Sequence, residues 1–342
     1  HRVVPAGCAV GVDRGVKTVM QAGKKQYRFD LEAKKKILER AEGIAAEDFD
    51  TPKQWQTMTD TLSGLFEEWK KIGFIQELPP TNWVDSPILI QRFIDTLLKS
   101  PHIQYLHFIG GETLITPAFK TILQSLINSG IHRQVSLGFT TGLTVWDDEI
   151  VELLLQFKEV NLGLSIECLH PVNDYVRYPS KIDSVKSTLD RWVDLAKDHN
   201  WYTQIRTTPT ILTIKHLISI FEYAYEKQVA VESCNFLNDP AYMRPSVLPL
   251  EYRQSIIENL TPWIADKELG SANVVNTRNP VFAQNQVVQD AQSYVNYLSE
   301  QPDESEKLPD LIAYLKAMEA SRKNKVIDYL PEYEKFFRAA GY

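Results

Sequence analysis

The feature that most constrains this fold is an alternation of short apolar runs with helical patterns between residues 104 and 266. Each apolar run has the length and residue types of a buried strand, and a helical pattern follows it. Strands that alternate with helices join by right-handed crossovers into a parallel sheet, so we expect an α/β fold. The expected strands are 104–109, 134–139, 160–166, 202–208 and 229–236, and the expected helices are 117–129, 147–157, 181–198, 214–227 and 250–266.

Segments on both sides of this alternation have a different character. Residues 1–30 read as irregular, and residues 268–281 are polar and loop-like. We expect three parts: an irregular start with a helical insertion at 1–100, a βα core at 101–267 and a helical extension at 268–342. The expected flanking helices are 31–46, 52–71, 87–98, 282–300, 306–320 and 331–339.

Composition excludes several classes of protein. The chain has 342 residues, 44% of them hydrophobic, and its net charge of -7 disfavours a general nucleic-acid binder. No apolar run reaches the roughly 18 residues that span a membrane, and no signal peptide is visible. The three cysteines, Cys8, Cys168 and Cys234, are far apart, which predicts no disulfide framework and a cytoplasmic location. We expect Cys168 and Cys234 to be small apolar residues rather than nucleophiles.

The first expected strand ends in Gly110, Gly111 and Glu112, and a helix begins near Pro117. Adjacent glycines bring the backbone close to a ligand, and Glu112 has the charge to pair with an ammonium group. The same residues also suit a tight turn followed by a helix, because a carboxylate is favourable near a helix start. The stretch alone leaves both interpretations open.

Polar residues recur at the same end of every expected strand, where parallel folds bind ligands. A Gly-rich nucleotide loop and a G-x-S-x-G nucleophile elbow are both absent from the sequence. The histidines lack paired spacing and the cysteines stand singly, so no metal site is expected from these residues. The polar strand-end residues are Thr140, Thr141, Ser165, Glu167, Arg177, Arg206, Thr207, Thr208, Glu232 and Asn235.

Four ordered motifs resemble those of the radical S-adenosylmethionine (radical SAM) superfamily, and most closely its twitch-domain proteins. The likeness covers about residues 86–340, and segments near Cys234 and Tyr314 share in it. The motifs are Phe108-Ile-Gly-Gly-Glu-Thr-Leu, Phe139-Thr-Thr-Gly, Leu164-Ser-Ile-Glu and Asp174-Tyr-Val-Arg-Tyr-Pro.

The resemblance implies a fold: a partial (β/α)6 TIM-like barrel of parallel strands. The first strand is then missing here, and a helical N-terminal insertion and a C-terminal helical extension are added. In the family, the loop after that strand carries C-x-x-x-C-x-x-C, whose cysteines hold a [4Fe-4S] cluster. This sequence has no such motif. We therefore expect the cluster ligands to lie upstream of His1, outside this chain, which as given would be inactive.

The resemblance also implies a cofactor site, position by position. Gly110, Gly111 and Glu112 are expected to bind the methionine amino group of S-adenosylmethionine, and Ser165 to lie by its ribose or carboxylate. Three departures from the family pattern put the individual contacts in question: Thr113 replaces Pro, Thr-Thr-Gly replaces Asn-Thr-Asn-Gly, and Glu167 replaces Asp. The expected cofactor-binding residues are Gly110, Gly111, Glu112, Thr141, Ser165, Glu167, Arg177 and Arg206.

The implied reaction is reductive cleavage of S-adenosylmethionine to a 5′-deoxyadenosyl radical, which abstracts hydrogen from a substrate. The resemblance implies an electron donor such as flavodoxin or ferredoxin. The substrate is not identified by the sequence, although the group's relatives often act on peptides. No cysteine follows Cys234, so no auxiliary cluster is expected. Two alternatives stay open. One is a cluster-free barrel pseudoenzyme or small-molecule binding protein. The other is an unrelated TIM-like enzyme that uses Glu112, Glu167 or Glu232 for acid-base chemistry.

Overall fold

The computed structural model describes residues 36–41, 43–44, 52–71, 83–100, 102–232, 236–267, 280–322 and 324–342. The chain divides into two compact units, His1–Leu89 and Ile90–Tyr342, which we describe separately. The expectations for residues 1–30 and 268–279, for Cys8 and Cys234, and for Asn235 fall outside the described residues.

The first unit contributes helices to the described part of the chain. Residues 36–41 are helical, and α3 spans Pro52–Lys71, as the sequence predicted. Arg40 pairs with Glu68 at 2.8 Å and so links these two helices. Helix α4, Pro87–Leu98, begins at the end of this unit and continues into the second.

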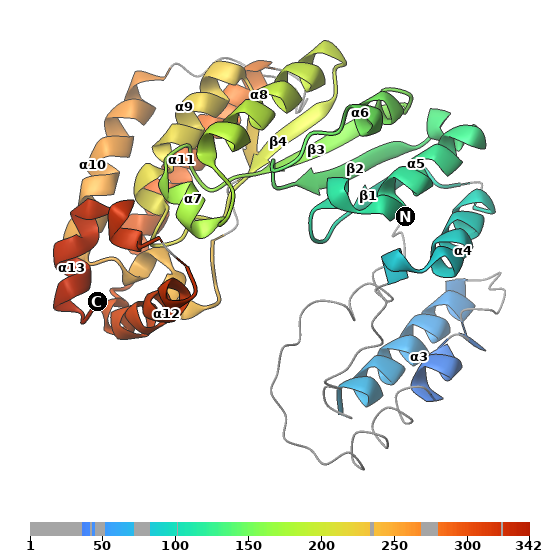
Figure 1. Ribbon diagram of the computed structural model, residues 1–342, viewed down its shortest axis with the longest axis horizontal. Helices are drawn as coiled ribbons and strands as arrows, with labels where there is room; N and C mark the ends of the chain where they lie inside the picture. Colours follow the sequence, from blue (N-terminus) through green and yellow to red (C-terminus); the bar gives the residue numbers. More distant parts are fainter. Residues whose placement is uncertain are drawn as a thin grey trace. The chain divides into compact units, whose positions relative to one another are not determined.

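The second unit is built on a five-stranded parallel sheet with the strand order β1-β2-β3-β4-β5 (Figure 1). The prediction of an α/β fold with parallel strands is thereby confirmed. Consecutive strands are neighbours, which is the arrangement of repeated right-handed βα units. The strands are β1 Tyr105–Phe108, β2 Ser136–Thr141, β3 Glu159–Ser165, β4 Tyr202–Arg206 and β5 Ala230–Glu232.

The connecting helices follow the strands in chain order, close to the predicted bounds. The largest differences are a shorter α6, a 3₁₀ turn over Ile214–His216 ahead of α9, and a short helix α7 that was not predicted. Helix α7 occupies the long loop after β3 because Asn173 and Tyr175 are fully buried there. These helices are α5 Pro117–Asn128, α6 Asp148–Leu154, α7 Val172–Val176, α8 Ile182–Asp198 and α9 Ile218–Lys227.

A helical C-terminal extension completes this unit. Arg253 on the first of its helices is 1% exposed and donates to the Leu298 and Gln301 carbonyls at 3.3 and 2.8 Å, so it ties α10 to α11. The elements are α10 Leu250–Asp266, α11 Pro280–Glu300, α12 Leu308–Ala320, the 3₁₀ turns η8 Val326–Asp328 and η9 Pro331–Tyr333, and α13 Glu334–Ala339.

The two faces of the sheet have opposite chemistry, because side chains alternate along each strand. One face is apolar and buried: Phe139 packs against Phe119 of α5 and Trp192 of α8, with ring centroids 5.6 and 5.9 Å apart. The other face carries polar side chains that are half-buried or exposed, with two buried glycines among them, and we call it the open face. The open-face residues are Tyr105, His107, Ser136, Gly138, Thr140, Glu159, Asn161, Gly163, Ser165, Tyr202, Gln204, Arg206 and Glu232.

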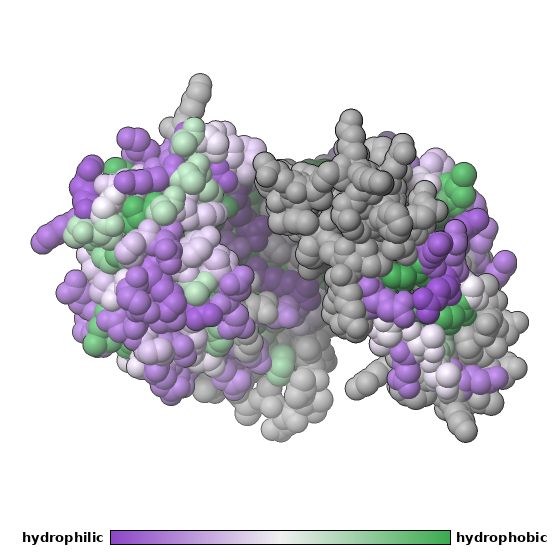
Figure 2. All heavy atoms as spheres, turned by 90° about the horizontal axis from the view of Figure 1, so that it is seen from below, coloured by the Kyte–Doolittle hydropathy of each residue, from purple (hydrophilic) through white to green (hydrophobic). Residues whose placement is uncertain are grey.

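Polar residues predominate on the surface seen in Figure 2, where hydrophobic residues stand in small separate groups. Within the described residues, none of the helices combines the length and the apolar character needed to cross a bilayer.

Candidate functional site

The turn after β1 exposes its backbone. Gly110 and Gly111 have φ angles of +120° and +36°, a region that L side chains rarely adopt, so glycine is required there. A Cβ built at either residue meets no described atom within 4 Å. The main chain at this turn is therefore open to the approach of a ligand.

Glu112 is held in one orientation at the carboxyl edge of the sheet. Its Oε1 accepts a hydrogen bond from the Leu114 N–H at 3.3 Å, which caps the 3₁₀ turn Thr113–Ile115. Its Oε2 accepts from the Gly142 N–H at 2.7 Å, just beyond the end of β2. The capping role that the sequence allowed and the ligand role are compatible, because a carboxylate has further lone pairs for a cationic ligand.

Gly142 lies between two opposite charges. A Cβ built on it would lie 3.3 Å from Glu112 Oε2 and 3.7 Å from Arg177 Nη1, with no other described atom beyond its chain neighbours within 4 Å. The absence of a side chain at Gly142 thus leaves a small space with a carboxylate on one side and a guanidinium on the other. We call these three residues the Gly142 cradle.

Arg177 is brought to the cradle by its pairing with Glu167. Its Nη2 lies 2.6 Å from Glu167 Oε1, and the two side chains are 30% and 15% exposed. Glu167 Oε2 in turn accepts from the Thr208 N–H at 2.9 Å, which fixes the carboxylate against the end of β4. Arg177 Nε is buried without a hydrogen-bond partner among the described residues. The guanidinium atom next to the cradle is Nη1, which lies 3.7 Å from the Cβ position of Gly142.

Arg206 belongs to a separate network on the open face. It donates to Thr140 Oγ1 at 3.1 Å and pairs with Glu232 at 2.7 Å, and Gln204 also donates to that carboxylate at 2.7 Å. Ser165 lies opposite Arg206 in the register of β3 and β4. These residues lie on the open face and are not part of the cradle.

Thr141 is placed differently from the other expected cofactor residues. It is 1% exposed on the apolar face of the sheet, and its hydroxyl accepts from the Leu143 N–H at 3.1 Å. We therefore do not carry it into the proposed site. Of the eight expected cofactor residues, the structure brings Glu112 and Arg177 together at Gly142. Glu167 pairs with Arg177.

Cysteine and histidine side chains offer no metal centre in the described part of the chain, where no group of three or more potential ligands occurs. Cys168 is fully buried, and burial raises the pKa of its thiol to about 12, as expected of an inert apolar residue. His170 stacks on His216 with ring centroids 3.5 Å apart, and burial lowers the pKa of His216 to about 4. The stacking of the two histidines was not visible from their spacing in the sequence.

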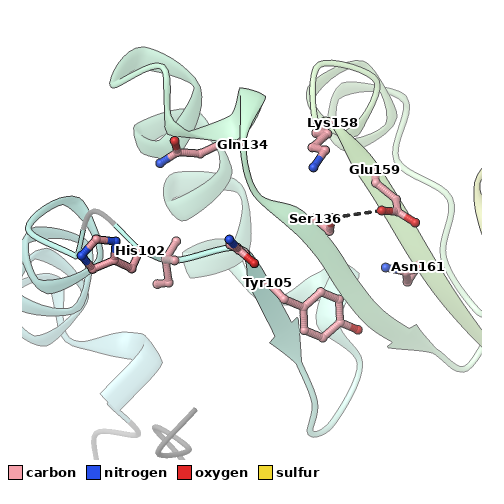
Figure 3. A pocket seen from close by; sticks show the side chains of 9 residues that line it. His102, Tyr105, Gln134, Ser136, Lys158, Glu159 and Asn161 are labelled. Carbon is pink, nitrogen blue, oxygen red and sulfur yellow. Dashed lines mark hydrogen bonds between the residues drawn. The ribbon is translucent and has the colours of Figure 1, made fainter. Parts of the chain in front are cut away.

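A cavity of about 570 Å³ lies at the opposite, amino end of β1, β2 and β3 (Figure 3). Ser136 donates to Glu159 across it at 3.0 Å. Its lining combines amide, hydroxyl and charged groups, and none of the expected cofactor residues takes part. The lining residues are His102, Ile103, Gln104, Tyr105, Gln134, Ser136, Lys158, Glu159 and Asn161.

Sequence reasoning missed Gly142 as a site residue, although it quoted the Phe139-Thr-Thr-Gly motif that contains it. The sequence does show a glycine directly after the polar strand end. The φ angle of Gly142 lies outside the left-handed region, so the backbone conformation does not require glycine there. It also missed the backbone N–H of Thr208, which no side-chain pattern could indicate.

Comparisons with known proteins give weak likenesses. Residues 13–77 match the family model "Domain of Unknown Function (DUF349)", and no curated protein matches the sequence significantly. A structure described as native anSMEcpe with bound AdoMet and Kp18Cys peptide is 16% identical, with a TM-score of 0.37, over 53% of this chain and 52% of that one. This chain thus spans about half the length of that protein.

Two structures of SuiB from Streptococcus suis are also similar. The one bound to S-adenosylmethionine is 14% identical over 74% of this chain and 66% of that one, with a TM-score of 0.36. The one bound to precursor peptide SuiA is 14% identical over 70% of this chain and 58% of that one, with a TM-score of 0.33. With every TM-score below 0.5, these likenesses do not establish what this chain does.

Proposed function

We propose that the carboxyl edge of the sheet binds S-adenosylmethionine and that this chain is the cofactor-binding part of a radical SAM enzyme. The observation that carries the proposal is the Gly142 cradle, where Glu112 and Arg177 flank an open space. The methionine part of the cofactor has an ammonium and a carboxylate on one carbon atom. Glu112 is the partner for the ammonium, and Arg177, through its Nη1 beside Gly142, is the partner for the carboxylate.

Exposed apolar side chains near the cradle residues in sequence support the same ligand. Ile109 precedes the two glycines and is 58% exposed, Ile115 lies three residues after Glu112 and is 63% exposed, and Tyr178 follows Arg177 and is 51% exposed. Exposed apolar side chains beside a few convergent polar groups are typical of small-molecule sites. They offer contact area for the apolar parts of the cofactor, its adenine ring and methylene groups.

The [4Fe-4S] cluster does not fit the described residues, since they hold no group of three potential ligands. We therefore derive no chemical step through it. Reductive cleavage of the cofactor, a peptide substrate, and a flavodoxin or ferredoxin as electron donor remain parts of the proposal that rest on the sequence motifs. What the described residues contribute is binding and orientation of the cofactor.

The alternative is a cluster-free protein that binds a small molecule at the same edge. The lack of a ligand set in the described residues favours it. Anaerobic reconstitution of the natural protein with iron and sulfide separates the two, because a stoichiometric cluster supports the enzyme. Binding of S-adenosylmethionine without any cluster on the natural protein supports the alternative.

Calorimetric titration with S-adenosylmethionine tests the cradle directly. We expect Gly142→Ala to lower the affinity by about tenfold or more, because the new methyl group occupies the space between the two charges. Glu112→Gln and Arg177→Gln each remove a charged hydrogen bond and should lower it by about 10- to 100-fold. Gly64→Ala is the matched control, since a Cβ there meets no described atom within 4 Å. Failure of the unaltered chain to bind, or unchanged binding by Gly142→Ala, would contradict the proposal.

A further inference from the structure

We propose that Glu319 of the C-terminal extension is a positioning residue for the cofactor site and acts on Arg177 through Tyr175. This inference rests on the proposed function and adds a role for the extension, which the sequence predicted as a helical segment without a function. The physical connection runs from α12 through α7 to the Gly142 cradle.

Glu319, on the last turn of α12, gathers three donors. Its Oε1 accepts from the Tyr175 hydroxyl at 3.0 Å and from the Val326 N–H at 2.7 Å, and its Oε2 accepts from the Tyr342 hydroxyl at 2.7 Å. The carboxylate therefore joins α7, η8 and Tyr342, which lies beyond α13, at one point. Hydrogen bonds to a charged acceptor are the stronger kind, so this point holds its partners firmly.

Tyr175 connects Glu319 to α7. Its side chain is 0% exposed, and its carbonyl accepts from Arg322 Nη1 at 3.0 Å. Both its side chain and its backbone are thus bonded to the extension. Burial, followed by the charge of Glu319, raises the pKa of the Tyr175 hydroxyl, which keeps it a donor toward the carboxylate.

Helix α7 ends at the residue that forms the cradle. Arg177 is its C-cap, and the Arg177 N–H donates to the Asn173 carbonyl at 2.9 Å. On its other side Asn173 Oδ1 accepts from the Glu167 N–H at 3.3 Å. A five-residue helix has few bonds of its own, so its position depends on what it is anchored to. A shift of α7 would move Arg177 relative to Gly142 and Glu112.

Two tyrosines that donate to the same carboxylate provide a matched test. Tyr175→Phe removes the bond that leads to α7, and Tyr342→Phe removes a bond that does not. We expect Tyr175→Phe to lower the affinity for S-adenosylmethionine by about threefold to tenfold, and Tyr342→Phe to change it by less than about twofold. The thermal unfolding midpoints of the two variants should fall by similar amounts. Equal losses of affinity in both variants would overturn the inference.

A double-mutant cycle shows whether the effect passes through Arg177. In an Arg177→Gln background, Tyr175→Phe should cause no further loss of affinity, because the group that it positions is already gone. Losses that simply add would overturn the inference. Glu319→Gln should retain more affinity than Glu319→Ala, since its carbonyl oxygen still accepts from the Tyr175 hydroxyl.

The cycle also separates the two proposals. If Arg177→Gln binds S-adenosylmethionine as well as the unaltered chain does, the proposed function fails. If Arg177→Gln weakens binding and Tyr175→Phe does not, the cradle stands and the positioning role of the extension fails.

Discussion

The two faces of the five-stranded sheet differ in chemistry and in what constrains their residues. The apolar face buries Leu137, Phe139 and Leu162 against helices. One apolar side chain can replace another there only if its volume fits the packed core. The open face holds ion pairs, hydroxyls and two strand glycines, so its residues are constrained by their partners. The comparison teaches that the fold is determined on one face, while the other face and the carboxyl edge determine what the protein binds.

The largest expected difference between the faces is in stability. Phe139→Ala removes a fully buried ring that packs on Phe119 and Trp192, and should lower the free energy of unfolding by about 3–5 kcal/mol. The next residue, Thr140, faces the open side, and Thr140→Ala should cost less than about 1.5 kcal/mol, the value of one hydrogen bond. Urea denaturation of the two variants measures this. Similar costs would mean that the faces do not differ as described.

The same contrast explains what the sequence predicted and what it did not. Apolar periodicity comes from the buried face, so β4 and helices α5, α8 and α10 were placed within about two residues. Open-face contacts leave no periodic signal. The pairing of Glu167 with Arg177 crosses ten residues, and that of Glu319 with Tyr175 crosses 144, so neither follows from local pattern.

Part of the candidate site could nevertheless be predicted. Gly110, Gly111 and Glu112 stand in one short stretch, and their turn chemistry marks a strand end that exposes backbone. Thr141 was misleading because the strand continues to it: alternation along β2 then points its side chain to the buried face. The number of residues between a motif and the strand end decides which face a side chain joins, and sequence alone places strand ends only approximately.

Gly163 offers a smaller effect that isolates the open face. A Cβ there would lie 2.8 Å from Thr140 Oγ1 and 2.9 Å from Arg206 Nε, so Gly163→Ala displaces Arg206 from its contacts with Thr140 and Glu232. We expect a loss of about 1–3 kcal/mol in the free energy of unfolding, as is usual for overpacking. Gly64→Ala is the control, because a Cβ there meets no described atom within 4 Å and should not lower stability. Equal stability of Gly163→Ala and the unaltered chain would show that Arg206 moves at no cost.

The smallest expected effect is the dependence of the open face on pH. Burial and the charge of Arg206 lower the pKa of His107, while Glu232 opposes them, and the Tyr105 hydroxyl lies 2.8 Å from His107 Nδ1. Folding therefore favours the neutral imidazole. This contribution to stability is present above the ordinary histidine pKa of about 6.5 and is lost as the pH falls through the lower folded value. Titration of the His107 ring protons by NMR should give a pKa below 6.5. Between pH 7.5 and 5, the thermal midpoint of His107→Gln should fall less than that of the unaltered chain. His170 and His216 are present in both proteins, so the difference between them reports His107. A His107 pKa at or above 6.5 would mean that Glu232 outweighs burial, and that the open face is stabilised by acid instead of weakened by it.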